Sequence, residues 1–119
     1  MIIKSFLIMN WIPLNEVTQL DEIVTNSQKA PLVIFKHSIR CSISSMAKNR
    51  LDKNEAPEGI NFYFLDLIRH RDISNKIAET FQVRHQSPQV LVIDKGKCIY
   101  NESHSGIHFD EIEMAAAQS

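Results

Sequence analysis

The sequence PLVIFKHSIRCSISSMAKNRL, residues 31–51, decides the fold of this chain. Its continuous apolar run, Leu32 to Phe35, is typical of a short strand that is buried on both faces. After a polar turn and Cys41, apolar residues recur at helical spacing, at Ile43, Met46, Ala47 and Leu51. The stretch therefore predicts a buried strand that turns into an amphipathic helix, with a cysteine where the helix begins.

Similar patterns lie on both sides of this stretch. Helical patterns cover three further segments, about residues 16–28, 72–81 and 107–114. Strand patterns cover residues 60–67 and 90–93 and a segment that starts at Cys98. Asn15 is the expected N-cap of the first helix, and Gly96 the expected turn residue between the last two strands.

The predicted order of elements is α-β-α-β-α-β-β-α. Helical crossovers imply parallel strands, whereas the tight turn at Gly96 makes the last two strands antiparallel. The start of the third strand is expected beside the end of the first. The predicted fold class is α/β, with a central mixed four-stranded sheet flanked by helices.

Length and composition define the broad class of protein. The 119 residues suffice for one domain, which we expect at residues 10–119, after an N-terminal extension at 1–9 that is loose or pairs as an edge strand. The formal net charge is -1 and no run of Lys and Arg is present, which argues against nucleic-acid binding. The apolar N-terminal stretch falls far short of the ~20 residues that cross a bilayer, so we expect no membrane partner and a cytoplasmic location.

Cys41 is the strongest candidate for chemistry because of its position. A helix N-terminus presents free N–H groups and a partial positive charge, which favour the thiolate, the nucleophilic form of cysteine. Arg40, His37 and Lys36 would add positive potential, and Ser44, one turn along, could donate a hydrogen bond to the sulfur. The alternative is a small buried cysteine without redox chemistry.

The pattern C-x-x-S, from Cys41 to Ser44, lacks the second cysteine that would form an internal disulfide. Cys98 cannot replace it, because a strand of ~3.3 Å per residue separates the two cysteines by roughly 17–20 Å. A disulfide needs Cα atoms within about 7 Å. We therefore expect Cys98 to be structural and Cys41 to depend on an external thiol.

Two further segments could line a site. Ser87-Pro88 directly precedes the third strand, where proline costs no sheet hydrogen bond and X–Pro permits a cis peptide. Ser105 and Gly106 precede the last helix, whose N–H groups could bind an anion, and an ordinary helix cap by Ser105 is an equal alternative. His104 and His108 have the spacing of two metal ligands, but no third ligand is near, so we expect no metal.

Three segments carry a resemblance to a known family. They are FKHSIRCSIS (residues 35–44), IAETFQVRHQSPQ (77–89) and SHSGI (103–107). Together they resemble the bacillithiol-system YtxJ-type family, the monothiol bacilliredoxins, from about Asn10 to the last helix. The family usually has proline directly after the cysteine, whereas this chain has Ser42. The resemblance implies a thioredoxin-like fold, Cys41 as the redox thiol and Ser87-Pro88 as the cis-proline element of its groove.

The resemblance also implies a reaction. A monothiol oxidoreductase of this kind uses a bacillithiol-like low-molecular-weight thiol as co-substrate and holds no tightly bound cofactor. Cys41 would take the thiol from an S-thiolated client protein, and a second thiol, small or protein-borne, would resolve the adduct. Ser105 and Gly106 would contact the carboxylates of the small thiol. Two alternatives stay open, namely a thioredoxin-fold binding or adaptor module and an iron–sulfur carrier of the monothiol glutaredoxin type.

Overall fold

Two sets of apolar residues, one on each face of a single sheet, organise the fold. The computed structural model describes residues 9–117. Along the chain its elements are β1 Trp11–Pro13, α1 Gln19–Asn26, β2 Leu32–His37, α2 Ser42–Asp52, β3 Asn61–Asp66, α3 Arg71–Phe81, β4 Gln89–Asp94, β5 Lys97–Ser103, the 3-10 turn η1 His104–Gly106 and α4 Phe109–Ala117.

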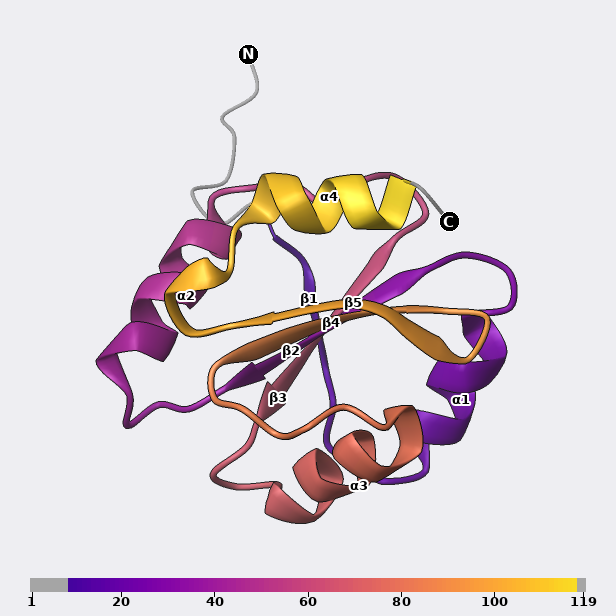
Figure 1. Cartoon of the computed structure of the whole chain (residues 1–119), viewed down its shortest axis with the longest axis horizontal. Coiled ribbons are helices and arrows are strands. Elements are labelled where there is room, and N and C mark those ends of the chain that lie inside the picture. The colour runs from indigo at the N-terminus through magenta and orange to yellow at the C-terminus, as the bar shows by residue number, and fades with distance from the viewer. Residues whose placement is uncertain (1–8, 118–119) are drawn as a thin grey trace.

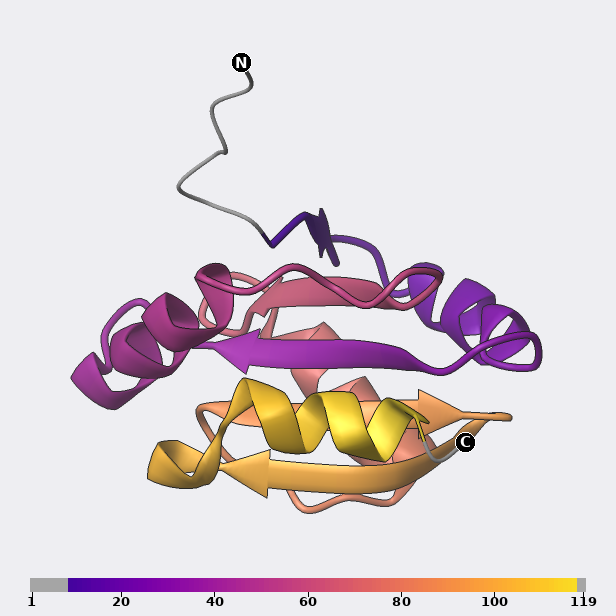
Figure 2. The same ribbon diagram turned by 90° about the horizontal axis from the view of Figure 1, so that it is seen from above.

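The strands form one mixed sheet in the order β1-β3-β2-β4-β5, which Figure 2 shows from above. β3 is parallel to both β1 and β2, whereas β4 is antiparallel to β2 and to β5. β2 is the central strand, and all 6 of its residues are buried. The apolar run at residues 32–35 is therefore buried on both faces of the sheet, as its pattern predicts.

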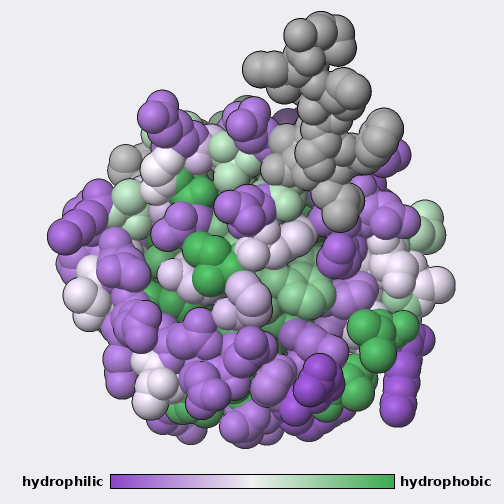
Figure 3. All heavy atoms as spheres, turned by 180° about the vertical axis from the view of Figure 1, so that it is seen from behind, coloured by the Kyte–Doolittle hydropathy of each residue, from purple (hydrophilic) through white to green (hydrophobic). Residues whose placement is uncertain are grey.

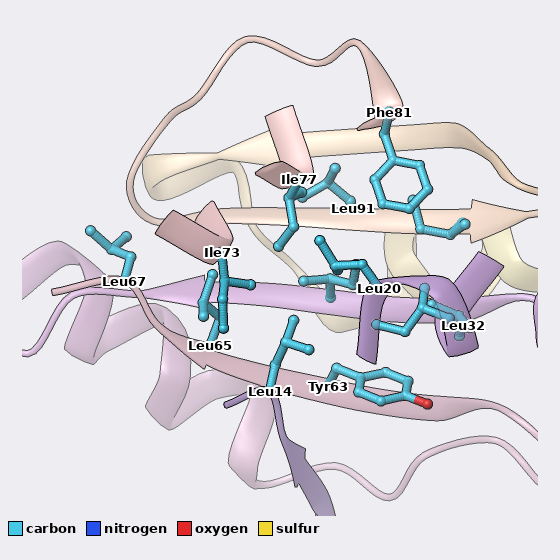
Figure 4. Packing of buried hydrophobic residues seen from close by; sticks show 13 residues of the cluster. Leu14, Leu20, Leu32, Tyr63, Leu65, Leu67, Ile73, Ile77, Phe81 and Leu91 are labelled. Atoms are coloured by element: carbon cyan, nitrogen blue, oxygen red, sulfur yellow. The ribbon is translucent and has the colours of Figure 1, made fainter. Parts of the chain in front are cut away.

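Alternate residues of β2 supply the two faces of the sheet. Leu32 and Ile34 pack with α1 and α3 in the cluster of Figure 4, together with Leu14, Leu20, Ile23, Tyr63, Leu65, Leu67, Ile73, Ile77, Phe81, Leu91 and Ile93. Val33 and Phe35 pack with α2 and α4, together with Met9, Ala47, Leu51, Phe62, Val90, Val92, Ile107, Ile112 and Ala116. Figure 1 shows α3 and α4 on opposite sides of the sheet.

The sheet has one strand more than the sequence predicts. β1 is only 3 residues long and pairs with β3 at the edge of the sheet. Such a short strand shows no alternation of apolar and polar residues, and it contains Pro13, which is tolerated at an edge. Met9 is buried and so belongs to the domain, while residues 1–8 of the expected extension lie outside the described part of the chain.

The pairing of β4 corrects the expectation that helical crossovers give parallel strands. The segment after α3 returns the chain to the edge at which β2 and β3 end, so β4 starts there and runs antiparallel to β2. The start of β4 therefore lies beside the end of β2, as predicted, with Lys36 opposite Gln89.

The first helix also begins later than predicted. α1 starts at Gln19, and Asn15 is not its N-cap, which is Thr18. The Gln19 side chain accepts hydrogen bonds from the N–H groups of Asn15 and Glu16, at 2.7 and 2.8 Å, and so orders the turn before the helix.

The surface gives no sign of a large apolar face on the side seen in Figure 3, where hydrophobic side chains form small groups separated by polar ones. Within residues 9–117, no helix is both long and apolar enough to cross a membrane.

Candidate functional site

Cys41 lies where the chain turns from β2 into α2. Its N–H donates to the Ser38 carbonyl at 3.2 Å, and its own carbonyl accepts a hydrogen bond from the Ser45 N–H at 3.1 Å. Cys41 is thus the N-cap residue of α2, with an extended backbone. Because the first N–H groups of a helix have no partner within it, they place a partial positive charge at this end of α2. Cys41 is partly exposed and Arg40 is exposed, so both reach the surface.

Ser44 is fully buried, and its hydroxyl links α2 to the end of β2. The Ser38 N–H donates to Ser44 Oγ at 3.0 Å, and this oxygen lies 2.6 Å from His37 Nδ1. Burial lowers the pKa of His37, and the Lys48 charge lowers it further. The ring is therefore neutral at pH 7, and its Nδ1 shares a hydrogen bond with the Ser44 hydroxyl.

This geometry changes the roles expected for His37 and Ser44. A neutral ring does not supply the positive charge that the sequence suggests for His37. The hydrogen bonds of Ser44 go to Ser38 and His37, at the base of the turn. Both residues therefore affect Cys41 indirectly, because they fix the start of α2, where Cys41 lies.

A second polar network ties α2 to β1 on the same face of the sheet. Trp11 Nε1 donates to Asp52 Oδ1 at 2.6 Å, and Lys48 Nζ forms an ion pair with Asp52 Oδ2 at 2.7 Å. Lys48 Nζ also lies 5.6 Å from the ring centre of Phe64. Sequence patterns do not reveal Asp52, because a carboxylate at a helix end has the signature of a surface residue until its tertiary partners are known.

Ser87 and Pro88 lie directly before β4, at the sheet edge where β2 ends. The peptide bond between them is cis. Pro88 is buried, and its carbonyl accepts a hydrogen bond from the His104 N–H at 3.0 Å. The segment is thus fixed to η1 on one side and continues into the sheet on the other.

η1 carries Ser105 and Gly106, the residues expected to bind an anion. It is joined to Pro88 through His104 and to α2 through Arg50, whose Nη2 donates to the Ile107 carbonyl at 2.8 Å. The structure therefore brings both predicted segments together beside α2. However, α4 begins only at Phe109, so its free N–H groups do not lie at Ser105 and Gly106 as the sequence suggests.

Cys98 lies at the other end of the sheet. It pairs with Ile93, which in turn pairs with Leu32 at the start of β2. At ~3.3 Å per residue, the 6 residues of β2 put it about 20 Å from the edge that carries Cys41. Burial raises the pKa of the Cys98 thiol, and both cysteines are free. In residues 9–117, no group of three or more His, Cys, Asp or Glu side chains is arranged to hold a metal ion.

Lys36 has a different place from the one that the sequence suggests. Two residues after Ile34, it points to the face covered by α3 rather than toward Cys41. It is fully buried, and its Nζ lies 3.3 Å from both the Ser74 carbonyl and His85 Nδ1. Burial lowers the pKa of Lys36 to about 8. Lys36 is thus part of a buried polar cluster behind β2.

Replacing Lys36 with methionine is expected to change how folding stability depends on pH. The lysine pKa falls from 10.5 to about 8 on folding, so between these values the unfolded chain holds a proton that the folded protein has lost. The penalty for burying the charge is therefore complete below pH 8 and is relieved as the pH rises, which increases wild-type stability in this window. From pH 7 to pH 10, the advantage of Lys36→Met over wild type should shrink by about 2 kcal/mol.

Urea denaturation of the two proteins across this pH range measures that difference. Cys98 and Tyr100 also titrate in alkaline solution, but they are present in both proteins and cancel in the comparison. The Lys36 charge lowers the pKa of His85, but burial is the larger cause, so His85 stays neutral above pH 7 in both proteins. Parallel stability curves for the two proteins would show that Lys36 does not titrate in this window.

A cysteine at a strand-to-helix junction, beside an X–Pro segment that opens an antiparallel strand, defines the class of thioredoxin-fold redox enzymes. A solved structure described as a proposed oxidoreductase with a thioredoxin fold is 26% identical with a TM-score of 0.77, over 91% of this chain and 93% of that one. Thioredoxin from Trypanosoma brucei brucei shares the fold at 14% identity and a TM-score of 0.69, over 96% and 92%. Mitochondrial thioredoxin 3 from Saccharomyces cerevisiae shares it at 20% identity and a TM-score of 0.66, over 92% and 95%.

Within this class, the chain belongs to the monothiol bacilliredoxin family described as BrxC, which matches residues 12–112. This result confirms the family that the three sequence segments suggest. The solved structures confirm the thioredoxin-like α/β fold, with the additional edge strand described above.

Proposed function

We propose that this protein removes a bacillithiol-like thiol from mixed disulfides on client proteins, with Cys41 as nucleophile. The observation that carries the proposal is the position of Cys41 at the N-cap of α2, with a buried serine at position 44. A helix start favours the thiolate, and the absence of a thiol at position 44 excludes an internal disulfide there. The family match to monothiol bacilliredoxins supports the choice of substrate.

The reaction is a pair of thiol–disulfide exchanges. The Cys41 thiolate attacks the small-thiol sulfur of the mixed disulfide, and the client cysteine leaves as a thiolate. A second thiol, from another small molecule or a protein, then attacks the sulfur of the small thiol on Cys41 and releases the Cys41 thiolate. In each cycle the client thiol is regenerated and the external thiol becomes the new disulfide partner of the small thiol, so one disulfide is consumed and one is formed. Such exchange needs a reducing compartment, for which we propose the cytoplasm.

We assign to the backbone at Ser87 the binding of the client as a short added strand, because Ser87 precedes β4 at the sheet edge where β2 leads into the turn that carries Cys41. Ser105 and Gly106 adjoin this segment through the hydrogen bond between His104 and Pro88. We assign to them the polar end of the small thiol, while Arg40 supplies an exposed positive charge beside Cys41.

Intact-protein mass spectrometry after mixing with a bacillithiolated client tests this proposal. Without a resolving thiol, wild-type protein should carry one bacillithiol mass on Cys41, and this adduct should persist. In a Ser44→Cys variant, the new thiol one turn away should displace the adduct and leave an internal disulfide.

Two outcomes would count against the proposal. Failure of the wild-type protein to acquire the adduct, with the client still modified, would favour a binding or adaptor role. Transfer to Cys98 instead of Cys41 would place the reaction at the end of the sheet opposite to the proposed site.

A further inference from the structure

The segment between α3 and β4 is held by buried polar side chains. It starts at Gln82, which ends α3 in a left-handed conformation with φ 54°, and it finishes with Ser87 and Pro88. The stretch has no regular secondary structure of its own. Backbone hydrogen bonds hold its two ends, from the Val83 N–H to the Ala78 carbonyl and from the His104 N–H to the Pro88 carbonyl, so its middle depends on side-chain hydrogen bonds. The structure supplies them from three separate elements, β2, α3 and β4.

The first anchor is the cluster around Lys36. Lys36 Nζ and Ser74 Oγ lie 3.3 and 3.1 Å from the same atom, His85 Nδ1. Burial lowers the pKa of His85, and the charges of Lys36 and Arg71 lower it further, so the ring is neutral. Because a lysine ammonium can only donate, Nδ1 is the acceptor for Lys36, and in that tautomer it also accepts from the Ser74 hydroxyl. These contacts fix the middle of the segment to β2 and to α3.

The second anchor is Gln89, which is also buried. Its Nε2 donates to the Arg84 carbonyl at 2.9 Å, and its Oε1 accepts from the Gln86 N–H at 3.3 Å. Gln89 lies directly opposite Lys36 in the pairing of β4 with β2. Two adjacent sheet residues thus hold three consecutive residues, 84–86, immediately before Ser87.

Stability alone gives no reason for the lysine. A buried amine loses its hydration, and the hydrogen bonds that it regains here go to one carbonyl and one imidazole. An apolar side chain of the same length would fill the space without that loss. What the lysine provides, and an apolar residue would not, is a directed bond to His85.

We propose that Lys36 and Gln89 are positioning residues that act through His85 and the backbone of residues 84 and 86 to hold Ser87 and Pro88 where a client disulfide binds. This inference rests on the proposed function, because it assigns these residues to the client-binding edge of that site. Neither residue needs to contact the client or the sulfur of Cys41.

Lys36→Met tests the inference, with Lys76→Met as control, since Lys76 is an exposed lysine on α3 paired with Glu79. For a bacillithiolated client peptide, we expect KM to rise about tenfold in Lys36→Met, because small misplacements of binding groups have effects of this size. Alkylation of Cys41 by iodoacetamide, which does not use the binding edge, should stay within about twofold, and so should kcat. Amide hydrogen exchange at residues 84–87 should become faster, while the melting temperature is unchanged or higher.

A second pair of variants keeps the test decisive if Lys36→Met does not fold. His85→Leu removes the acceptor from the partly exposed segment and should reproduce the rise in KM. His85→Asn retains an acceptor close to the position of Nδ1 and should restore much of the binding.

Unchanged KM and unchanged exchange in both Lys36→Met and His85→Leu would overturn the inference. A parallel loss of melting temperature, alkylation rate and kcat would also overturn it, because that pattern marks a general structural role. If the wild-type protein has no activity on the peptide, the proposed function fails, and exchange at residues 84–87 alone decides whether Lys36 positions the segment.

Discussion

Replacing Cys41 with serine is expected to lower the rate of thiol removal at least about a thousandfold, since loss of an enzyme's nucleophile has effects of this size or larger. A hydroxyl has nearly the shape of a thiol but does not ionise near neutral pH, so it cannot form the mixed disulfide with the small thiol. Position 41 has an extended backbone, and serine is a favourable N-cap residue there. The variant should therefore fold at least as well as the wild type.

The measurement is the release of client thiol from a bacillithiolated protein, with the resolving thiol in excess. Cys98→Ser is the matched control, because it removes the other thiol from the far end of the sheet. Its rate should lie within about twofold of wild type, as expected for a residue that takes no part in the reaction. A Cys41→Ser protein that retains full activity would eliminate the mechanism, and a comparable loss in Cys98→Ser would show that the assay reports stability rather than chemistry.

The sequence predicts the fold well where local pattern and tertiary environment agree. The apolar run of β2 is buried throughout. Of the apolar residues spaced along the helix after Cys41, Ala47 and Leu51 are buried, whereas Ile43 and Met46 remain exposed. β1 is not predicted, because three residues are too few to show a strand periodicity and because its place in the sheet depends on pairing with β3. The direction of β4 also depends on a return segment, whose length and anchors are tertiary features.

The functional site likewise contains residues that local sequence position predicts and residues that only the tertiary structure reveals. Cys41 and Ser87-Pro88 are recognisable because their chemistry follows from position along the chain, at a helix start and before a strand. The buried cluster of Lys36, Ser74 and His85 joins residues far apart in sequence. The one sign of it in the sequence is that Lys36 follows Leu32 and Ile34 at every second position, so its side chain lies on the same buried face of the strand. Similarly, the neutral state of His37 follows from burial, which a residue in a predicted turn does not reveal.

Phe35→Ala is expected to destabilise the protein by about 3–5 kcal/mol, the range found when a fully buried aromatic side chain is removed from a core. Phe35 has 0% exposure and stands between three other rings. Its centroid lies 5.6 Å from that of Trp11, 5.8 Å from His37 and 6.2 Å from Phe64. Because these rings come from different strands, no single neighbour can move to fill the space, and most of the cavity should persist.

Thermal and urea denaturation measure this loss, with Ile99→Ala on the exposed side of β5 as control. Ile99 retains 46% exposure, so its truncation should change stability by no more than about 0.5 kcal/mol. The loss in Phe35→Ala should also reach the site, because His37, which packs against Phe35, holds Ser44 and with it the start of α2. Faster hydrogen exchange at the amides of residues 42–45, at a temperature where the variant is still folded, would demonstrate that connection. A stability change below about 1 kcal/mol would instead mean that the aromatic layer collapses around the missing ring and that the rigidity of the α2 start has another source.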